Sequence, residues 1–433
     1  MSFKLRFAIL LNMLDIKFIK ENQDLVKEAI KKKKIKFDLD ELIKLDDQRL
    51  ALLKEVEELR TKQNTASQNI MSTEDGEVKE QIITDMKSLK SDLQTKEEGL
   101  KKIVHEWKLL MLRVPNIPDM SVPEGDGEED NVEEKTWGEK PNFDFTPKDH
   151  VELMTTLGMV DFERGVKAHG FRGYFLKGDG ARLSWAIWNY ARDFFEARGF
   201  EPFIAPAILK KEHFYGTGHL PGDADDLYKT QDDDYLSGTS EVAMMAYHAD
   251  EILKKEELPK RYLAFSPCYR REAGSHGKDT KGLIRVHEFY KLEQLVLCEA
   301  SHMTSAEIHE ELTKNNEDFI ESLGLSYRRL EICTGDLKGA HVKSYDTEIY
   351  VPGEDKYREI ASTSYYHDFQ TRRFNTRYDD NGQKRYAHSL NGTAIPTPRI
   401  LVSLVENYQE ADGSIKIPPV LVKYFGQEKI TTN

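Results

Sequence analysis

The sequence has few cysteines and no long apolar segment, and both absences narrow the kind of protein it encodes. Its three cysteines, Cys268, Cys298 and Cys333, form no C-x-x-C pair and match no metal-ligand spacing. We therefore expect a reducing compartment and no disulfide framework. No apolar run approaches the roughly 20 residues that a membrane-spanning helix needs, so we expect no membrane partner. The basic and apolar start lacks the small-residue cleavage site of a secretory signal peptide.

Net positive charge is also lacking. The chain has 62 Lys and Arg against 76 Asp and Glu, which gives a net charge of −14. Taken alone, this balance argues against a nucleic-acid binder, but phosphate binding depends on local basic patches and not on the total charge. Acidic residues concentrate at 124–134 and 223–234, whereas residues 1–113 are much more basic than those runs. The length of 433 residues allows two or three domains.

Two long helices are predicted near the N-terminus, at residues 38–70 and 77–112, with a turn at Asp75-Gly76 between them. Each carries an apolar stripe about two-sevenths of its surface wide, which is the width of a coiled-coil seam. We expect an antiparallel hairpin that reaches roughly 50 Å at 1.5 Å per residue. The stripe residues are Leu39, Leu42, Ile43, Leu50, Leu53 and Val56, then Ile82, Met86, Leu89, Leu93, Leu100, Val104, Trp107 and Met111.

A coiled coil is most often a dimerisation rod, and that interpretation stays open here. A hairpin that closes on itself leaves no seam for a partner, which favours an arm that reaches toward another molecule. Pro115, Pro118 and Pro123, followed by the acidic run, predict a linker after the hairpin.

The remainder of the chain alternates between strand-like and helical patterns. An amphipathic helix is predicted at 182–198, and a strand that ends at Pro206 follows at 200–206. Strands with helices to one side predict an α+β fold with a mainly antiparallel sheet. Further strands are expected at 262–268, 284–294, 327–333, 345–351, 357–362 and 386–391.

Three arginines occur in motifs that suit a nucleotide. Arg270 lies in Tyr-Arg-Arg-Glu-Ala-Gly, Arg285 precedes Val-His-Glu-Phe, and Arg399 opens a helix-like run downstream of Asn391-Gly392-Thr393. A guanidinium binds carboxylate and phosphate through two parallel hydrogen bonds. Each arginine taken alone is best explained as an exposed surface charge. Three arginines that all occur in such motifs are better explained as ligands of a nucleotide. The sequence has no Walker loop and no G-x-G-x-x-G after a strand, which excludes two other nucleotide-binding folds.

These segments resemble motifs 2 and 3 of class II aminoacyl-tRNA synthetases, and their detail resembles seryl-tRNA synthetases in particular. The helix, strand and proline at 182–206 resemble motif 1, the dimer-interface element of the class. Because the resemblance begins at Met13, residues 1–12 are interpreted as an N-terminal extension. The resemblance implies a tRNA-binding helical arm at 13–114, a linker at 115–144 and a class II catalytic domain at 145–433.

The same resemblance implies the nucleotide site. Arg270 would bridge the amino-acid carboxylate and the α-phosphate of ATP, while Arg285 and Arg399 would hold the outer phosphates. Phe289 would stack on adenine, and Glu272 would accept a hydrogen bond from its amine. The implied catalytic residues are Arg270, Arg285 and Arg399, and the implied ATP-binding residues are Arg270, Arg271, Glu272, Val286, Phe289, Glu359, Ile360, Ala361, Ser362 and Arg399.

Magnesium and serine sites are implied as well. Glu359 and Ser362 match the magnesium-binding positions, and hard oxygen ligands together with ATP oxygens suit Mg²⁺. Thr393 stands where the family usually has serine, and Gly238 stands where it often has proline. Thr239 also fits a helix N-cap with Glu241 in the first turn, and that alternative stays open. The implied serine-binding residues are Thr239, Ser240, Glu241, Arg270, Glu293, Asn391 and Thr393.

A member of this family would be a cytoplasmic homodimer that makes seryl-adenylate from L-serine and ATP. It would then charge tRNA-Ser, and tRNA-Sec where that tRNA exists. The resemblance implies that residues 274–282, with Lys278 and Lys281, cover ATP and guide the tRNA 3′ end. No role is assigned to His276, His287 or His341. The basic arm residues expected near tRNA are Lys54, Arg60, Lys62, Lys79, Lys87, Lys90, Lys101 and Lys102.

Three rival functions remain to be distinguished. A ligase that loads a carrier protein would typically lack the helical arm, which this chain retains. A non-catalytic RNA-binding paralogue would be expected to lose arginines of motifs 2 or 3, and all three are present. A purely structural coiled-coil protein would leave residues 150–425 without a purpose.

Overall fold

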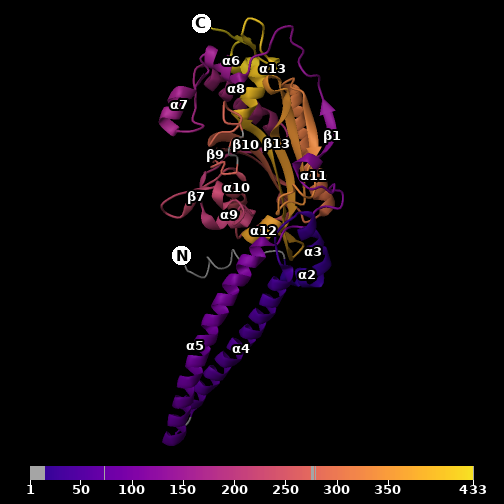
Figure 1. The fold of residues 1–433 in the computed structure, drawn as a ribbon. Helices are drawn as coiled ribbons and strands as arrows, with labels where there is room; N and C mark the ends of the chain where they lie inside the picture. The colour runs from indigo at the N-terminus through magenta and orange to yellow at the C-terminus, as the bar shows by residue number, and fades with distance from the viewer. Residues whose placement is uncertain (1–14, 73, 275–276, 278, 433) are drawn as a thin grey trace. The chain divides into compact units, whose positions relative to one another are not determined.

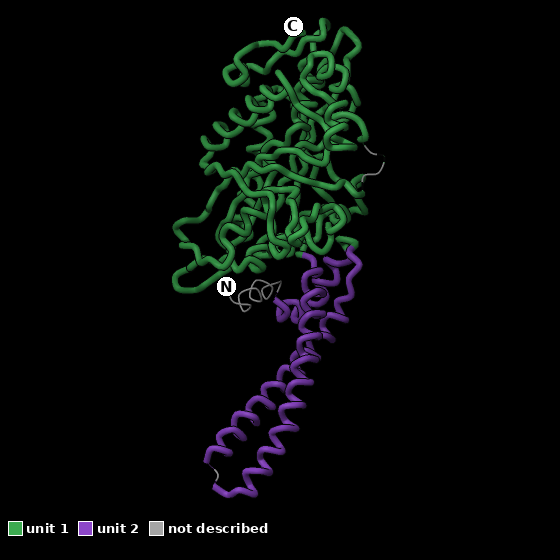
Figure 2. The backbone as a smooth tube through the Cα atoms, turned by 90° about the vertical axis from the view of Figure 1, so that its left-hand side faces the viewer, with its two compact units in different colours: residues 1–12, 32–34, 116–433 green, residues 13–31, 35–115 purple. Residues whose placement is uncertain are grey.

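The computed structural model describes residues 15–72, 74–274, 277 and 279–432. The chain divides into two compact units, shown in Figure 2. The smaller unit contains residues 13–31 and 35–115, and the larger unit contains residues 32–34 and everything from Asn116 onward. The expected extension at 1–12, together with His276 and Lys278, lies outside the described residues.

The smaller unit is helical. It consists of α2 (Ile16–Glu21), α3 (Gln23–Lys32), α4 (Leu39–Ser72) and α5 (Gly76–Arg113). The long helices α4 and α5 pack along each other as a hairpin (Figure 1). Asp75 is the N-cap of α5, and its carboxylate accepts hydrogen bonds from the backbone N–H groups of Glu77 and Val78. The expected hairpin is therefore present, although Gly76 begins the helix and is not part of the turn.

The seam between α4 and α5 is less apolar than the sequence suggested. Leu50 was assigned to the stripe but is 46 % exposed. In its place, the buried carboxylate of Asp46 pairs with Lys20 at 2.5 Å and with Arg49 at 2.7 Å. A buried charge is tolerated here because both partners are cationic. The seam residues that are fully buried are Leu39, Leu42, Val56, Leu93, Trp107 and Met111.

The larger unit is built on an eight-stranded sheet. Every neighbouring pair in this sheet is antiparallel except β4 and β9, which run parallel. The predicted α+β class with a mainly antiparallel sheet is confirmed. In sheet order the strands are β1 (Val132–Trp137), β11 (Tyr327–Glu331), β12 (Lys343–Val351), β13 (Lys356–His367), β16 (His388–Thr397), β10 (Glu288–Cys298), β9 (Lys260–Tyr269) and β4 (Glu201–Ile204).

Two predicted strand boundaries are wrong for the same physical reason. The strand expected from residue 284 begins at Glu288, because its partner β9 ends at Tyr269, which pairs with Glu288. Residues 284–287 therefore lie beyond the end of β9 and do not pair with it as a strand. Tyr386 was placed in the last strand, but it ends the separate strand β15 (Gln383–Tyr386) and pairs with Arg377 of β14 (Arg377–Asp380). Both cases depend on strand pairing, which local apolar patterns do not encode.

Helices cover the sheet and enclose the main core. The helix α11 (His302–Ser322) contacts β10, β12, β13 and β16, and α8 (Asp179–Glu196) contacts β4, β9 and β16. Buried aromatic residues such as Phe195 and Phe319 fill the space between these helices. The other α-helices are α6 (His150–Thr156), α7 (Phe162–His169), α9 (Lys211–Thr217), α10 (Glu241–Tyr247), α12 (Phe369–Phe374), α13 (Arg399–Asn407) and α14 (Pro419–Phe425).

Small sheets complete the larger unit. One of them joins β8 (Ile252–Lys254) to β14 and β15, and another joins β5 (Ile208–Lys210), β7 (Asp234–Leu236) and β6 (Tyr228–Lys229). Two-stranded pairs form between β2 (Val160–Asp161) and β3 (Phe175–Leu176), and between β17 (Ile415–Lys416) and β18 (Lys429–Ile430). Short 3₁₀ turns lie at Glu128–Asp130, Ala224–Asp226, Lys255–Glu257 and Pro352–Glu354.

Residues 32–34 group with the larger unit because Lys33 is buried there. Its ammonium donates hydrogen bonds to the backbone carbonyls of Lys338, Gly339 and His341 at 3.2, 3.1 and 2.5 Å.

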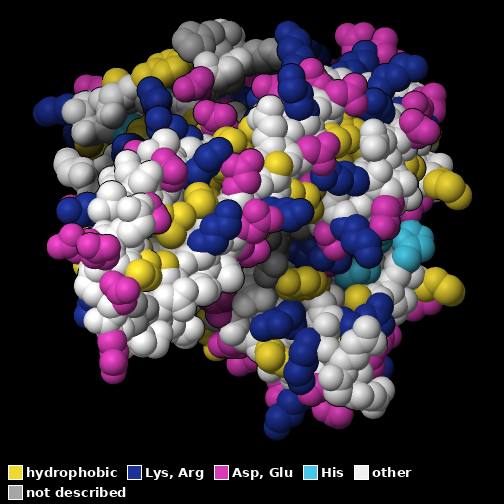
Figure 3. Space-filling view, turned by 90° about the horizontal axis from the view of Figure 1, so that it is seen from below, with side chains coloured by type: hydrophobic (Ala, Val, Ile, Leu, Met, Phe, Trp, Pro, Cys, Tyr) yellow, Lys and Arg dark blue, Asp and Glu magenta, His cyan; other side chains and the backbone are white. Residues whose placement is uncertain are grey.

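On the surface, charges of both signs occur together, and Lys and Arg side chains are interspersed with Asp and Glu in the view of Figure 3. Within the described ranges, no helix combines the length and the apolar character that crossing a membrane requires.

Candidate functional site

The sheet register places most of the implied site residues on one face. In β10, the alternating residues Phe289, Lys291 and Glu293 point to the same side. In β16, Thr393 pairs with Glu293, and Asn391 pairs with Leu295, so both lie on that side as well. The opposite side of the sheet packs against α11. The strands thus present a polar face and an apolar face, and the polar one carries the site.

An irregularity in β13 brings the implied magnesium ligands together. Glu359 and Ser362 are three residues apart, so an unbroken strand would place them on opposite faces. A β-bulge at Ile360 shifts the phase, because Glu359 pairs with Glu348 of β12 while Ser362 pairs with Asp346. Glu348 and Asp346 share a face, and so do their partners. The bulge therefore turns Glu359 toward the site.

A cleft opens on the polar face, and its lining includes all three arginines of the implied nucleotide site together with Phe289 and Glu359. Arg271, Ala361 and Ser362 do not line it, although Ser362 shares its face. The implied serine-binding residues Thr239 to Glu241 also lie outside its lining. The cleft is lined by Arg270, Glu272, Leu283, Ile284, Arg285, Val286, Phe289, Lys291, Glu359, Ile360, Thr393, Pro396, Thr397, Pro398 and Arg399.

Two of the three arginines already pair with carboxylates. The guanidinium of Arg285 donates to Glu272 at 2.7 Å and to Asp279 at 3.4 Å. Arg399, the first residue of α13, donates to the backbone carbonyl of Glu359 at 2.6 Å, and its guanidinium lies 3.7 Å from the carboxylate of that residue. The assignment of Glu272 to the adenine amine stays a prediction, since Arg285 occupies it in this structure.

Arg270 is held differently, between a ring and a carbonyl. Its guanidinium lies 5.3 Å from the ring centroid of Phe289 and donates to the carbonyl of Gly238 at 3.3 Å. A Cβ atom at position 238 would approach Cγ of Arg270 to 3.0 Å. Glycine at this position therefore leaves room for the arginine, and a larger residue would require it to shift.

A buried carboxylate organises the implied serine pocket. Glu293 is 3 % exposed and accepts hydrogen bonds from the hydroxyl of Thr239 at 2.7 Å and from the backbone N–H of Ser240 at 2.6 Å. The ammonium of Lys291 pairs with it at 2.7 Å. Burial acts to raise the pKa of Glu293, but the charge and hydrogen bond of Lys291 and the bonds from Ser240 and Thr239 outweigh burial and lower it. Glu293 is thus held as an anion.

The N-cap interpretation of Thr239 is wrong by one residue, although its hydroxyl does contact the first turn of α10. Ser240 is the N-cap residue of α10, and the hydroxyl of Thr239 accepts from the backbone N–H of Glu241 at 3.2 Å while it donates to Glu293. Thr239 consequently supports the start of the helix and the pocket together. Asn391 accepts a hydrogen bond from Tyr366 at 3.0 Å.

Glu241 is a second buried carboxylate beside the first. It is 7 % exposed and accepts a hydrogen bond from Gln370. Burial raises the pKa of Glu241 to about 7, with Gln370 opposing the rise and the charge of Glu293 adding to it. Ionising two adjacent carboxylates in one buried site is energetically unfavourable. The different surroundings of Glu293 and Glu241 therefore shift their pKa values in opposite directions.

Sequence reasoning missed two site residues. Lys291 shares the i, i+2 spacing of Phe289 and Glu293 on one strand, and that alternation could have identified it. Asp346 enters the site through the pairing of β12 with β13, which no local pattern reveals. Burial, with the charge of Glu359, raises the pKa of Asp346 well above its usual value.

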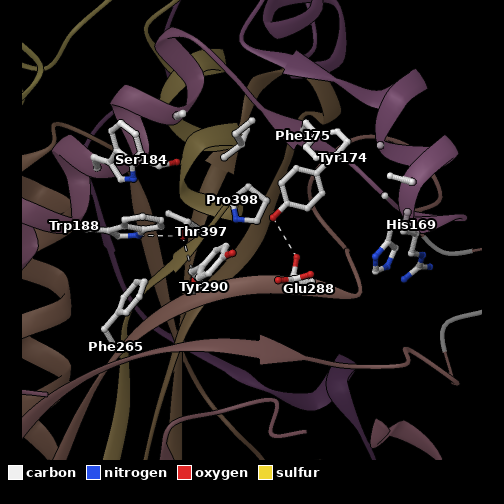
Figure 4. A pocket seen from close by; sticks show the side chains of 17 residues that line it. His169, Tyr174, Phe175, Ser184, Trp188, Phe265, Glu288, Tyr290, Thr397 and Pro398 are labelled. Carbon is white, nitrogen blue, oxygen red and sulfur yellow. Dashed lines mark hydrogen bonds between the residues drawn. The ribbon is translucent and has the colours of Figure 1, made fainter. Parts of the chain in front are cut away.

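A second cavity, of about 630 Å³, lies on the other face of the sheet (Figure 4). Its wall includes Trp188, whose indole N–H donates to the hydroxyl of Thr397 at 3.0 Å, and Tyr174, whose hydroxyl donates to the carbonyl of Glu288 at 3.1 Å. Trp185 of α8 also lines it and is 60 % exposed. This cavity is mostly apolar and aromatic, and it includes none of the three arginines.

The raised pKa of Glu241 predicts a pH-dependent stability. Ionising this group costs the folded state more than the unfolded state, so the wild-type protein should lose stability as pH rises from about 4.5 to about 7. Glu241→Gln keeps an acceptor for Gln370 but cannot ionise. Its advantage over wild type in free energy of unfolding should grow by about 3 kcal/mol across that range.

Urea unfolding followed by circular dichroism between pH 4.5 and 8 measures this difference. Glu163→Gln, at an exposed glutamate of α7, is the matched control and should follow wild type throughout. Parallel pH profiles for Glu241→Gln and wild type would show that Glu241 carries no such penalty.

Comparison with known proteins matches both parts of the chain. A family model described as the seryl-tRNA synthetase N-terminal domain matches residues 13–118, and one described as the tRNA synthetase class II core domain (G, H, P, S and T) matches residues 228–408. The serine–tRNA ligase of Deinococcus radiodurans is 44 % identical over 96 % of this chain and 99 % of its own length. That of Thermodesulfovibrio yellowstonii is 41 % identical over 96 % and 100 %.

Solved structures agree with these matches. The seryl-tRNA synthetase of Pyrococcus horikoshii, crystallised with ATP, has a TM-score of 0.87 and 37 % identity over 97 % of this chain and all of its own. The cytoplasmic serine–tRNA ligase of Naegleria fowleri, in complex with AMP, has a TM-score of 0.83 and 32 % identity over 97 % of this chain and 99 % of its own. The chain belongs to the seryl-tRNA synthetase family of class II aminoacyl-tRNA synthetases and has the serine–tRNA ligase function of that family.

Proposed function

We propose that the cleft on the polar face holds ATP and that the adjoining pocket around Glu293 holds serine. The observation that carries this proposal is the shared face: Phe289 and Glu293 lie on one side of β10, with Arg270 against Phe289. An aromatic ring for adenine and a buried anion for an ammonium group are thereby four residues apart on one strand. The α-phosphate and the serine carboxylate would meet between them.

The three arginines would carry the charge of the reaction. When the serine carboxylate attacks the α-phosphate, negative charge builds on phosphorus and then leaves on pyrophosphate. Arg270, which lies beside Phe289, would contact both the carboxylate and the α-phosphate, and Arg285 and Arg399 would hold the leaving phosphates. Fixed guanidinium groups stabilise this charge without reorganising during the step.

The oxygen ligands beside Arg399 suit Mg²⁺. Glu359 and Ser362 share a face because of the bulge at Ile360, and the carboxylate of Asp346 lies opposite Ser362. Hard carboxylate and hydroxyl oxygens are the ligands that magnesium accepts alongside ATP phosphates. We propose that Glu359 and Ser362 hold the ion directly, where it would neutralise phosphate charge. Asp346 would fix the hydroxyl of Ser362.

Arg270→Ala should reduce serine-dependent exchange of pyrophosphate into ATP by about a hundredfold or more, because it removes charge stabilisation from the transition state. Exchange measured without tRNA isolates the activation step. Arg164→Ala is the control, since this arginine of α7 has a side chain that is 74 % exposed. Near-wild-type exchange in Arg270→Ala would contradict the assigned role, and loss in both variants would point to a general defect.

We propose that the smaller unit binds tRNA-Ser through the hairpin of α4 and α5. The hairpin exposes basic side chains on both helices, and a long duplex stem can be recognised by shape through its phosphates and 2′-hydroxyls. Lys281, at the end of the segment 274–282, would help to guide the 3′ end. Charging of tRNA-Sec is proposed on family resemblance alone.

Shortening the hairpin should separate the two half-reactions. Replacing residues 61–96 with a short Gly-rich turn keeps the pair between Arg60 and Glu97, whose atoms lie 2.6 Å apart across the hairpin. Pyrophosphate exchange should remain near wild type, while charging of tRNA-Ser should fall by about two orders of magnitude as phosphate contacts are lost. Retained charging would show that tRNA binds elsewhere, and lost exchange would show that the hairpin supports the cleft.

We propose that the protein is a homodimer joined through α8 and β4, the segment that resembles motif 1. As the last strand of the sheet, β4 presents unpaired backbone groups, and edges of this kind are usually covered. Ile204 on β4 is 86 % exposed, Ile208 is 62 % exposed and Trp185 is 60 % exposed. Apolar side chains clustered on one chain segment favour an interface.

The buried thiols of Cys268, Cys298 and Cys333 are all free, which supports a reducing, cytoplasmic location.

Ile204→Asp should convert the dimer to a monomer, because it would bury an unpaired charge in the interface. Sedimentation equilibrium should then give the 50.0 kDa of one chain, against twice that mass for wild type. Met303→Asp, at a 71 % exposed methionine of α11, should remain dimeric. A monomeric wild-type protein, or a dimeric Ile204→Asp, would contradict this interface.

A further inference from the structure

Lys291 is a buried cation to which the roles above assign no contact with a substrate. It is 6 % exposed and lines the cleft. On its strand it lies midway between Phe289 and Glu293, and same-face neighbours in a strand are about 6.6 Å apart. Lys291 is therefore located between the proposed adenine contact and the proposed ammonium contact, where the serine carboxylate would lie.

The hydrogen bonds of Glu293 show that Lys291 is not needed merely to satisfy that carboxylate. Glu293 already accepts from the hydroxyl of Thr239 at 2.7 Å, and from the backbone N–H and the hydroxyl of Ser240 at 2.6 and 2.5 Å. Taking an ammonium out of water is costly, and a buried ion pair seldom repays that cost in stability. A buried lysine at the reaction centre points to an anionic group that arrives with the substrate.

We propose that Lys291 receives the carboxylate of the incoming amino acid, and this rests on the serine pocket proposed above. The pair Lys291–Glu293, with its charged atoms 2.7 Å apart, is the electrostatic complement of a zwitterion. On binding, the ammonium of serine replaces Lys291 as the partner of Glu293. The displaced ammonium of Lys291 then pairs with the serine carboxylate, so charges alternate from Glu293 through both ends of serine to Lys291.

Lysine suits this exchange better than arginine. Its ammonium is a compact charge on a four-carbon stem with freely rotating donors, so it can leave one carboxylate and meet another within a small space. A guanidinium locked in a two-bond fork with Glu293 would resist release. Lys291 is thus a binding residue for the carboxylate and remains beside the oxygen that forms the bond to the α-phosphorus as the bond to pyrophosphate breaks.

The rival role for Lys291 is support of Glu293 alone, and two ligands distinguish the roles. L-serinamide keeps the ammonium and hydroxyl of L-serine but has a neutral amide in place of the carboxylate. If Lys291 binds the carboxylate, its removal affects serine and spares serinamide. If Lys291 only keeps Glu293 ionised and in place, its removal weakens both ligands equally, because both present the same ammonium.

Isothermal titration of the full-length dimer with L-serine and with L-serinamide tests the proposal. Wild type should bind serine more tightly than serinamide. In Lys291→Met, the preference for serine should fall by about tenfold to a hundredfold, which is the value of a charge-assisted hydrogen bond. Serinamide affinity should change by less than about threefold, which lies within the usual effect of a neutral contact. Lys291→Arg should recover part of the preference, because it restores the charge.

Several outcomes would overturn the proposal. Equal affinity of wild type for the two ligands would do so without any variant, so a Lys291→Met protein that does not fold still leaves the proposal testable. Equal losses for serine and serinamide in a folded Lys291→Met would assign Lys291 to the support of Glu293. Wild type that binds neither ligand would reject the serine pocket itself, and with it the role of Lys291. Binding of a non-hydrolysable ATP analogue by each variant confirms an intact cleft.

Discussion

The register of the antiparallel strands is the constraint on which the cleft depends. Side chains alternate between two faces, so each strand can supply the cleft only at every second position. The bulge at Ile360 breaks this rule, and another irregularity near the cleft lies at Ala394, where Leu292 pairs with Ile395 while Glu293 pairs with Thr393. Each inserts one residue and re-aims a side chain that chemistry needs. A one-residue slip without them would turn Glu359 or Thr393 toward the apolar core.

Burial of charge then decides what the face can recognise. Glu293 is anionic because Lys291, Ser240 and Thr239 outweigh its desolvation, whereas Glu241, with fewer donors, has its pKa raised to about 7. The pKa values of two neighbouring glutamates are therefore shifted in opposite directions. In the proposed serine pocket, Glu293 would present its negative charge to the substrate ammonium, with less repulsion from Glu241 than a second full charge would create. Hydroxyl donors from Thr239 and Ser240 fix the position of that charge as well as its sign.

The sequence predicted the elements of this site better than their arrangement. Long apolar stripes made α4 and α5 predictable, because helix periodicity is local. The buried carboxylate of Asp46 on α4 was not predicted, because its partner Lys20 lies on another helix. Motif spacing identified Arg270, Arg285 and Arg399 through resemblance to a family. The start of β10 and the entry of Asp346 were not predictable, since both depend on which strand pairs with which. Lys291 was visible in the alternation of β10 but carried no motif of its own.

The charged side chains of the cleft are paired with one another, and this pairing bears on how substrates would bind. Arg285 pairs with Glu272 and Asp279, Arg399 lies near Glu359, and Lys291 pairs with Glu293. In the proposed binding mode, a phosphate or carboxylate that enters would exchange one ion pair for another, so much of the Coulomb attraction would cancel. Affinity for a single substrate is therefore smaller than a count of its contacts suggests. The exchange would still discriminate between ligands. A ligand that lacks one of the charges would leave a buried charged side chain without a partner, and the full desolvation cost of that side chain would weaken binding. The protein contacts of Arg285 and Arg399 hold both guanidinium groups beside the cleft. In the proposed mechanism, these groups would stabilise the charge that develops on phosphorus more strongly than the charge of bound ATP.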